Sequence, residues 1–231
     1  MGNPGHAGVE RARDVQIASG AATLAGELNV PASAQGVVLF AHGSGSSRHS
    51  QRNQFVARVI RAAGVGTLLF DLLTREEEAV DIYTRHLRFD IQLLAGRLVD
   101  ATNWLKQSDE LGRLRVGYFG ASTGGGAALV AAAELGDEVG AVVSRGGRPD
   151  LAGEALPRVK APTLLVVGGY DEPVIELNEE AYAQLRCEKE LQIVPGATHL
   201  FEEPGTLEAV ARRAAEWFQK HLQAHASHPR E

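Results

Sequence analysis

Basic residues, long apolar runs and cysteine are all scarce in this chain, and each scarcity excludes a class of protein. Its 231 residues include 23 Lys and Arg against 29 Asp and Glu, which gives a formal net charge of −6 and a pI of about 5.8. An acidic chain of this kind is a poor partner for nucleic acid and for anionic membranes. No apolar run approaches the about 20 residues that cross a bilayer. The first residues, MGNPGHAGVERARD, lack the apolar core of a secretory signal, so we expect a cytoplasmic protein that binds neither membrane nor nucleic acid.

Cysteine occurs once, at position 187, so no disulfide can form within the chain. A reducing compartment is compatible with this count. Cys187 follows an Ala- and Leu-rich helical stretch and lies outside every motif described below, so we expect it to have a packing or surface role. No stretch has the residue spacing of a metal site, and we expect neither a metal nor a cofactor.

Short apolar runs alternate with helical patterns along the chain. From the third run onward most are unbroken blocks such as VVLF, TLLF and LLVV, which are typical of strands buried on both faces of a parallel sheet. The first two runs alternate with polar residues and fit an antiparallel edge. The predicted strands lie near Val15–Ala18, Leu24–Val30, Val37–Ala41, Gly66–Phe70, Leu114–Phe119, Ala141–Ser144, Leu164–Val167 and Leu191–Val194. The predicted helices lie near Gln51–Ala63, Phe89–Gln107, Thr123–Leu135, Glu176–Leu185 and Leu207–Ala224. This alternation predicts an α/β protein with a mostly parallel, doubly wound sheet.

Nothing in the composition divides the chain into parts. With 44% hydrophobic residues and no internal repeat, the chain suits one domain, which we place at 13–224. Residues 1–12 and 225–231 are predicted to be loose tails. The charged segment LLTREEEAVDIYTRHLR, residues 72–88, is predicted to be a solvated loop or helix face. Its place after a strand also allows it to lie over a site.

One serine stands where an apolar run meets a cluster of glycines, in RVGYFGASTGGGAALVAAAELG. Ser122 lies between Gly120 and Gly124 and so matches the pattern G-x-S-x-G. The run VGYF before it predicts a strand, and the Ala-rich stretch after it predicts a helix. In this setting the glycines let the backbone pack closely around a strained turn, and the hydroxyl stands at a helix N-terminus whose dipole favours developing negative charge. A simple tight turn is the alternative, but the context predicts a nucleophile.

A serine nucleophile needs a histidine base held by a carboxylate, and two later loops supply both. His199 lies in the turn-rich loop PGATHLFEEPG, directly after the predicted strand LQIV. Asp171 follows the strand LLVV in GGYDEPV, and Glu172 is the neighbouring alternative. Asp171 is preferred because it comes first after the glycines, whereas Glu172 precedes Pro173, which restricts its backbone.

A second glycine-rich loop, HGSGSS, directly follows the buried run VVLF. Glycines there let backbone N–H groups point into a site. We expect the N–H groups of Ser44 and Thr123 to form an oxyanion hole, and His42 to bond loop backbone rather than act as a second base. A phosphate-binding loop is the competing interpretation, but the loop lacks the lysine and the spacing of that motif.

Together these motifs resemble the α/β-hydrolase superfamily, and most closely its dienelactone-hydrolase-like branch. They are HGSGSS (42–47), GASTGG (120–125), SRGGRPD (144–150), GGYDEPV (168–174) and GATHLF (196–201), and the order Ser122, Asp171, His199 is that of the superfamily. The stretch SRGGRPDLA resembles the hydrolase part of bacterial proteins that are sometimes fused to a phosphoribosyltransferase, although no such second domain fits in these 231 residues. The resemblance implies the α/β-hydrolase fold, with an eight-stranded sheet whose second strand is antiparallel, and hydrolysis of esters or lactones. The dienelactone hydrolases that name the branch carry cysteine as nucleophile, so Ser122 argues against dienelactone itself as the substrate.

The gap between the predicted strands that end near Ser144 and begin near Pro162 is short. Larger lipases of the superfamily insert a lid there, so we expect no large lid. Arg145 borders this gap, and Arg85 and Arg88 lie in the charged segment. A planar guanidinium pairs well with a substrate carboxylate, which makes the three arginines candidates for substrate binding. The alternative is that they are ordinary surface arginines.

The sequence therefore predicts a metal-free serine hydrolase that cleaves small carboxylic esters or lactones through an acyl-enzyme. A thioesterase, amidase, peptidase or acyltransferase would use the same fold and triad, so these alternatives stay open. A non-catalytic binding module of the same fold also stays open, although such a module usually loses a member of the triad.

Overall fold

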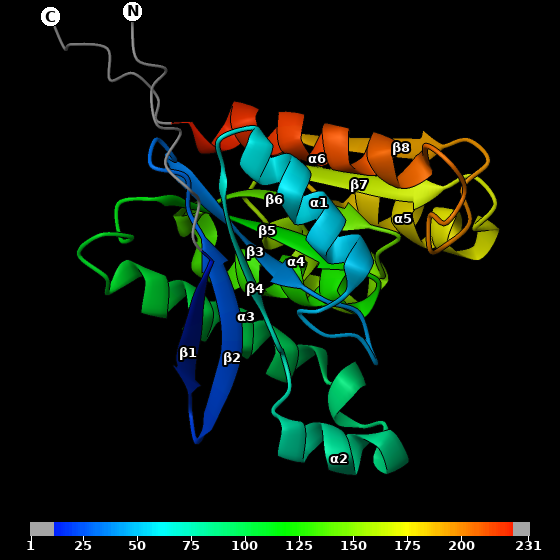
Figure 1. Cartoon of the computed structure of the whole chain (residues 1–231). Helices are drawn as coiled ribbons and strands as arrows, with labels where there is room; N and C mark the ends of the chain where they lie inside the picture. The colour runs from blue at the N-terminus through cyan, green and yellow to red at the C-terminus, as the bar shows by residue number, and fades with distance from the viewer. Residues whose placement is uncertain (1–11, 224–231) are drawn as a thin grey trace, which may run out of the picture.

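The computed structural model describes residues 12–223, and eight strands form one sheet in the order β1-β2-β4-β3-β5-β6-β7-β8 (Figure 1). The strands are β1 (Arg13–Ser19), β2 (Ala22–Asn29), β3 (Gly36–Ala41), β4 (Gly66–Phe70), β5 (Arg115–Ala121), β6 (Val139–Arg145), β7 (Thr163–Gly168) and β8 (Lys189–Val194). β2 is antiparallel to both β1 and β4, and the six strands from β3 to β8 run parallel. The unbroken blocks that predicted a parallel sheet are the buried strands β3, β4 and β7, so the predicted architecture is confirmed.

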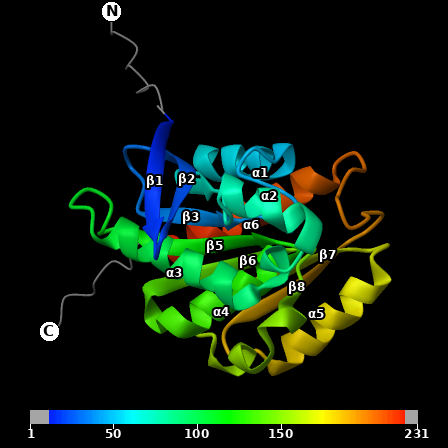
Figure 2. The same ribbon diagram turned by 90° about the horizontal axis from the view of Figure 1, so that it is seen from below.

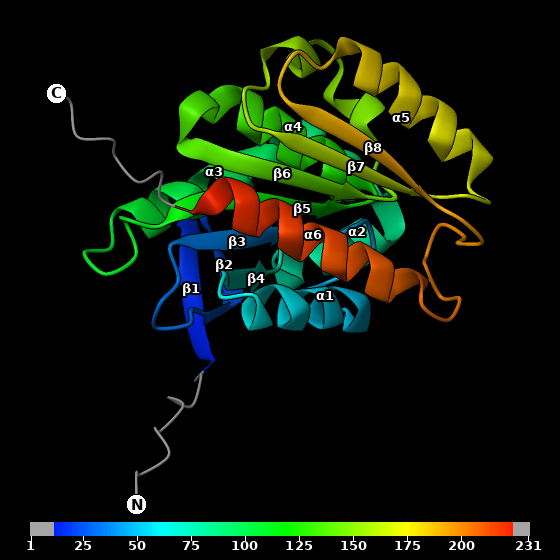
Figure 3. The same ribbon diagram turned by 90° about the horizontal axis from the view of Figure 1, so that it is seen from above.

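Helices cover both faces of this sheet. They are α1 (Gln51–Ala62), α2 (Arg75–Thr84), α3 (Ile91–Lys106), α4 (Thr123–Leu135), α5 (Glu172–Gln184) and α6 (Thr206–Leu222). α3, α4 and α5 cover one face (Figure 2), whereas α1 and α6 pack side by side on the other (Figure 3). Each face has its own apolar cluster, as a doubly wound sheet requires.

The structure decides one open alternative and corrects one boundary. The charged segment forms the helix α2, which begins at a capping box: Thr74 Oγ1 accepts from the Glu77 N–H, and the Glu77 carboxylate accepts from the Thr74 N–H. α5 begins at Glu172 rather than near Glu176, because Pro173 occupies a first-turn position, where its missing N–H costs nothing. The predicted tails fall outside the described residues, except for Ala12.

No large lid interrupts the sheet. Between β6 and β7 the chain forms only short 3₁₀ turns, with a kink at Gly153, which has φ of +46°. Two further 3₁₀ turns, η1 (Leu87–Phe89) and η2 (Gly136–Glu138), complete the described elements. Within residues 12–223, no helix combines the length and apolar character needed to span a bilayer.

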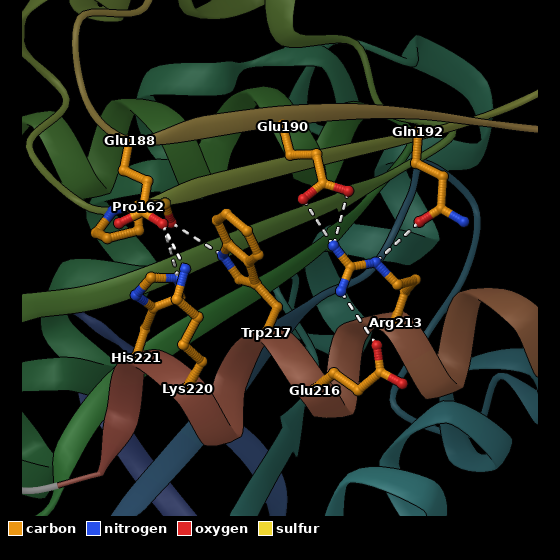
Figure 4. A network of polar contacts seen from close by, with 9 residues as sticks. All are labelled: Pro162, Glu188, Glu190, Gln192, Arg213, Glu216, Trp217, Lys220 and His221. Carbon is orange, nitrogen blue, oxygen red and sulfur yellow. Dashed lines mark hydrogen bonds and ion pairs between the residues drawn. The ribbon is translucent and has the colours of Figure 1, made fainter.

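The edge strand β8 is tied to α6 by charged side chains (Figure 4). Arg213 donates to both oxygens of Glu190 at 2.7 Å, and Lys220 lies 2.6 Å from Glu188. Trp217 Nε1 donates to the Pro162 carbonyl at 3.3 Å. The network aligns α6 along β8, which sets the position of the loop between them. That loop carries His199.

Candidate active site

Ser122 lies at the sharp turn between β5 and α4. Its backbone has φ of +51° and ψ of −123°, a conformation that is costly for any residue other than glycine. Two hydrogen bonds support the turn: the Ser122 N–H donates to the Arg145 carbonyl at 3.3 Å, and the Ser122 carbonyl accepts from the Arg148 N–H at 3.0 Å. Strained backbone that is held by its surroundings is a mark of functional sites, and here it places the half-buried Ser122 at the start of α4.

The glycines on either side make this turn sterically feasible. A Cβ at Gly124 would lie 2.1 Å from the Ala41 carbonyl oxygen at the end of β3. A Cβ at Gly120 would lie 2.5 Å from the Gly124 carbonyl oxygen. Both obstacles are backbone atoms, which cannot swing aside as a flexible side chain can. The pattern G-x-S-x-G is therefore required by packing at this position.

Gly124→Ala is expected to lower the free energy of unfolding by about 1–3 kcal/mol, the usual cost of overpacking, as measured by urea denaturation. Gly96 in α3 provides the control, because a Cβ there would meet nothing within 4 Å. Gly96→Ala should raise the stability by about 0.5–1 kcal/mol, since alanine favours the helix. A Gly124→Ala protein as stable as the wild type would contradict the close packing of α4 on β3.

His199 and Asp171 meet over the ends of β7 and β8. His199 Nδ1 lies 2.6 Å from Asp171 Oδ2, and the Asp171 side chain is 13% exposed. Asp171 is the N-cap residue of α5, yet its side chain makes no capping bond. An aspartate at this position normally caps its helix, so the pairing with His199 replaces the cap. Glu172, the alternative acid, is an exposed residue in the first turn of α5.

The end of β6 connects the serine turn to the histidine loop. The Arg145 carbonyl accepts from the Ser122 N–H, and the next residue, Gly146, lies against His199: a Cβ there would be 3.6 Å from His199 Cε1. Within the described residues, Ser122 and His199 form no hydrogen bond with each other. All three residues thus follow the carboxyl ends of parallel strands, and the Asp171–His199 contact is made.

The loop after β3 lies against the start of α4. Its Ser44 N–H donates to Thr123 Oγ1 at 3.0 Å. Thr123 is the first residue of α4, so its own N–H has no acceptor within the helix. To act as an oxyanion donor, the Ser44 N–H would have to share or release its bond to the Thr123 hydroxyl.

His42 is held as a neutral structural residue. Its Nε2 accepts from the Leu72 N–H at 3.0 Å, so the proton resides on Nδ1, which donates to the Gly43 carbonyl at 3.0 Å. Burial lowers the pKa of His42, which favours the neutral ring. Both ring nitrogens are occupied by backbone, which fits the sequence interpretation of His42.

A cavity of about 260 Å³ opens beside this loop and beneath α2; we call it the α2 cavity. Residues 43–46 form one wall, and Leu72, Leu73 and Leu94 form an apolar wall. α2 and the turn after it contribute Glu78, Asp81, Ile82 and Arg88. Nothing in the sequence marks Glu78 or Asp81 as site residues, because they lie in a charged run that resembles a solvated helix face.

Asp81 holds the turn after α2 in place. Its side chain is fully buried, and it accepts from the Leu87 N–H at 2.7 Å and from Arg88 Nε at 2.5 Å. Burial would raise the pKa of Asp81, but these bonds together hold that pKa below its ordinary value. Arg88 is thereby fixed at the cavity, where its Nη1 would lie 3.5 Å from a Cβ on Gly45.

The other two candidate arginines lie elsewhere. Arg85 is an exposed residue that ends α2 in the left-handed conformation, with φ of +58°. Arg145 is only 8% exposed, and its guanidinium carbon lies 5.9 Å from the centre of the Phe201 ring. Burial, together with the nearby charge of Arg52, lowers the pKa of Arg145 to about 10. Of the three arginines, the structure places only Arg88 on the wall of the α2 cavity.

Cys187 lies apart from these groups. It precedes β8 and its Sγ is 3.7 Å from the hydroxyl of Thr163 at the start of β7, whereas the candidate residues follow the strand ends. Burial raises the pKa of its thiol, which makes the thiolate scarcer. In the described part of the chain, no group of three or more His, Cys, Asp or Glu side chains is arranged to hold a metal ion.

Comparison with known proteins agrees with this architecture. A family model described as the dienelactone hydrolase family matches residues 21–227. The chain belongs to the dienelactone hydrolase family. A crystal structure of a dienelactone hydrolase from Anabaena variabilis is 62% identical and has a TM-score of 0.91, covering 93% of this chain and 99% of that one. Family membership supports a hydrolase activity on the α/β-hydrolase fold.

Other relatives differ in length or in sequence. Est1E from Butyrivibrio proteoclasticus has a TM-score of 0.75 at 18% identity, covering 90% of this chain and 98% of that one, and so shares the fold. A putative phosphoribosyl transferase of Mycobacterium tuberculosis is 59% identical over 212 residues, which are 92% of this chain but 47% of that protein. The chain thus spans about half the length of the curated relatives that it matches.

Proposed function

We propose that the protein is a serine hydrolase that cleaves small carboxylic esters or lactones through a covalent acyl-enzyme. Ser122 attacks the carbonyl carbon, and His199 takes the hydroxyl proton and then gives it to the leaving oxygen. Asp171 orients His199 and stabilises the imidazolium that forms. The N–H groups of Thr123 and Ser44 hold the negative oxygen of the tetrahedral intermediate. Water, activated by His199, then releases the acyl group.

The 2.6 Å contact between His199 Nδ1 and Asp171 carries this proposal. Asp171 leaves its own helix uncapped to make the contact, which is hard to explain by stability alone because an N-cap contributes about 0.5–2 kcal/mol. With Nδ1 donating to the carboxylate, the other ring nitrogen is left as an acceptor for a serine proton. The strained turn at Ser122 and the short loop after β6 supply the rest of the arrangement.

The proposal is tested by labelling with a fluorophosphonate, which reacts with an activated serine. We expect one label per chain, on Ser122 by peptide mass spectrometry, and its loss in His199→Ala. His86, an exposed histidine after α2, provides the control, and His86→Ala should still be labelled. An unlabelled wild-type protein would point to a binding module. Once labelling is established, activated esters, thioesters and anilides separate the acyl-transfer chemistries.

A further inference from the structure

We propose that the α2 cavity is the acyl-binding subsite and that Glu78 selects acyl groups that carry a hydroxyl or ammonium donor over acyl groups that carry a carboxylate. The proposal rests on the serine hydrolase function and adds a substrate class to it. Three features carry it: the side of the sheet on which the cavity lies, the shape of its walls, and the charge that its walls leave unbalanced.

The position of the α2 cavity relative to His199, the proposed base, identifies which part of the substrate the cavity receives. Ser122 follows β5, in the middle of the sheet, and His199 follows β8, at one edge. The cavity is lined by residues that follow β3 and β4, on the opposite side of β5. The leaving oxygen must face His199 to receive its proton, so the acyl group extends toward the β3–β4 side. Gly43, which lines the cavity, lies beside Ser122, since a Cβ on Gly43 would be 3.1 Å from Ser122 Cβ, so an acyl group on Ser122 is next to the cavity wall.

The walls of the cavity suit a short acyl chain. Its volume of about 260 Å³ lies below the roughly 300–1,000 Å³ typical of pockets for drug-sized ligands. Leu72, Leu73 and Leu94 offer apolar contact along one side, and Ile82 of α2 completes it. α2 therefore covers the cavity although the protein has no large lid.

The charges around the cavity leave one carboxylate unbalanced. Asp81 and Arg88 form an ion pair at 2.5 Å and offset each other, and His42 is neutral with both ring nitrogens occupied. Among residues 12–223, the Glu78 carboxylate has no hydrogen-bond or ion-pair partner. Burial, with the nearby charges of Asp71 and Asp81, raises the pKa of Glu78 more than the nearby charge of Arg88 lowers it.

Arg88 does not reverse this selectivity. Its Nε is committed to Asp81, and the ion pair fixes the guanidinium plane against the Gly45 loop. The cavity wall carries the carboxylates of Asp81 and Glu78 against the single guanidinium of Arg88, so two negative charges oppose the one positive charge. A hydroxyl or ammonium group instead supplies the donor that Glu78 lacks.

Three p-nitrophenyl esters of equal acyl length test the selectivity: the hexanoate, the 6-ammoniohexanoate and the hydrogen adipate. In the wild type, kcat/KM for the ammonium ester should exceed that for the carboxylate ester by at least about 100-fold, as expected for opposite charges near a partly buried carboxylate. Glu78→Gln should reduce this ratio by at least about tenfold, and Glu78→Lys should invert it.

Glu76→Gln is the matched control, because Glu76 lies in the same helix with the same charge but is exposed and does not line the cavity. Its ratio should equal that of the wild type, and circular dichroism should show all variants folded. A wild type that prefers the adipate ester, or a ratio that Glu78→Gln and Glu76→Gln change equally, overturns this proposal while leaving the hydrolase intact. No hydrolysis of the hexanoate, with no fluorophosphonate label on Ser122, overturns the hydrolase function and this subsite with it.

Discussion

Ser122→Ala is expected to lower kcat for an activated ester by on the order of 10⁴–10⁶. The alanine variant has no nucleophile, and only the oxyanion donors and substrate binding then remain to accelerate hydrolysis by water. The fold should be unchanged, because the Ser122 side chain makes no capping bond at the start of α4 and its turn is held through backbone atoms. Steady-state kinetics with p-nitrophenyl esters and far-ultraviolet circular dichroism measure the two quantities.

Cys187→Ser is the control for this experiment. The dienelactone hydrolases that name the family carry a cysteine nucleophile, and Cys187 is the single cysteine of this chain. The activity of this variant should stay within about twofold of the wild type, since the thiol is half-buried where β7 and β8 begin, away from the strand ends that carry the triad, and its pKa is raised. An active Ser122→Ala protein with an unchanged fold would remove Ser122 from the mechanism. Loss of activity in Cys187→Ser with the fold preserved would bring the thiol back into it.

Asp171→Asn is expected to lower kcat by on the order of 10²–10⁴. The amide cannot stabilise the imidazolium of His199, and it allows the wrong tautomer, in which the nitrogen that should accept the serine proton is already protonated. KM should change little, because Asp171 bonds His199 and not the substrate. The variant should fold, since Asp171 does not cap α5 in the wild type.

Glu172→Gln removes one charge from the adjacent residue and should cost less than about tenfold in kcat. Glu172 is exposed in the first turn of α5, where a lost carboxylate weakens only the interaction with the helix dipole. Measuring both variants with one activated ester decides the identity of the acid. A larger loss in Glu172→Gln than in Asp171→Asn would transfer the role to Glu172.

The sheet could be predicted from the chain because its strands are unusually apolar. Runs such as VVLF and LLVV have no polar face, so they fit only positions covered on both sides, and helical patterns between them leave few other topologies. The helix that prediction left open, α2, and the start of α5, which it misplaced, depend on local chemistry that periodicity does not report. α2 owes its start to the capping box of Thr74 and Glu77, and α5 begins early because Pro173 is tolerated in a first turn.

The candidate triad could also be predicted, because each member follows a strand of the parallel sheet and the carboxyl ends of parallel strands lie on the same side. Its roles stay predictions until the variants are measured. The contacts of the HGSGSS loop, which carries the expected oxyanion donor Ser44, were less predictable. The sequence suggested a free Ser44 N–H, and only the structure reveals that this group donates to Thr123 Oγ1.

By itself, the sequence determined the order of strands and helices, the need for glycine around Ser122, and the three loops that carry Ser122, Asp171 and His199. These follow from patterns within short stretches of chain. The tertiary structure alone decided that Asp171 binds His199 instead of capping α5, that Asp81 is buried and holds Arg88, and that Glu78 faces a cavity. A carboxylate looks the same in a sequence whether it faces solvent or a cavity. Its role is set by groups from other elements, which come within a few ångströms of it only when the sheet and its helices have packed.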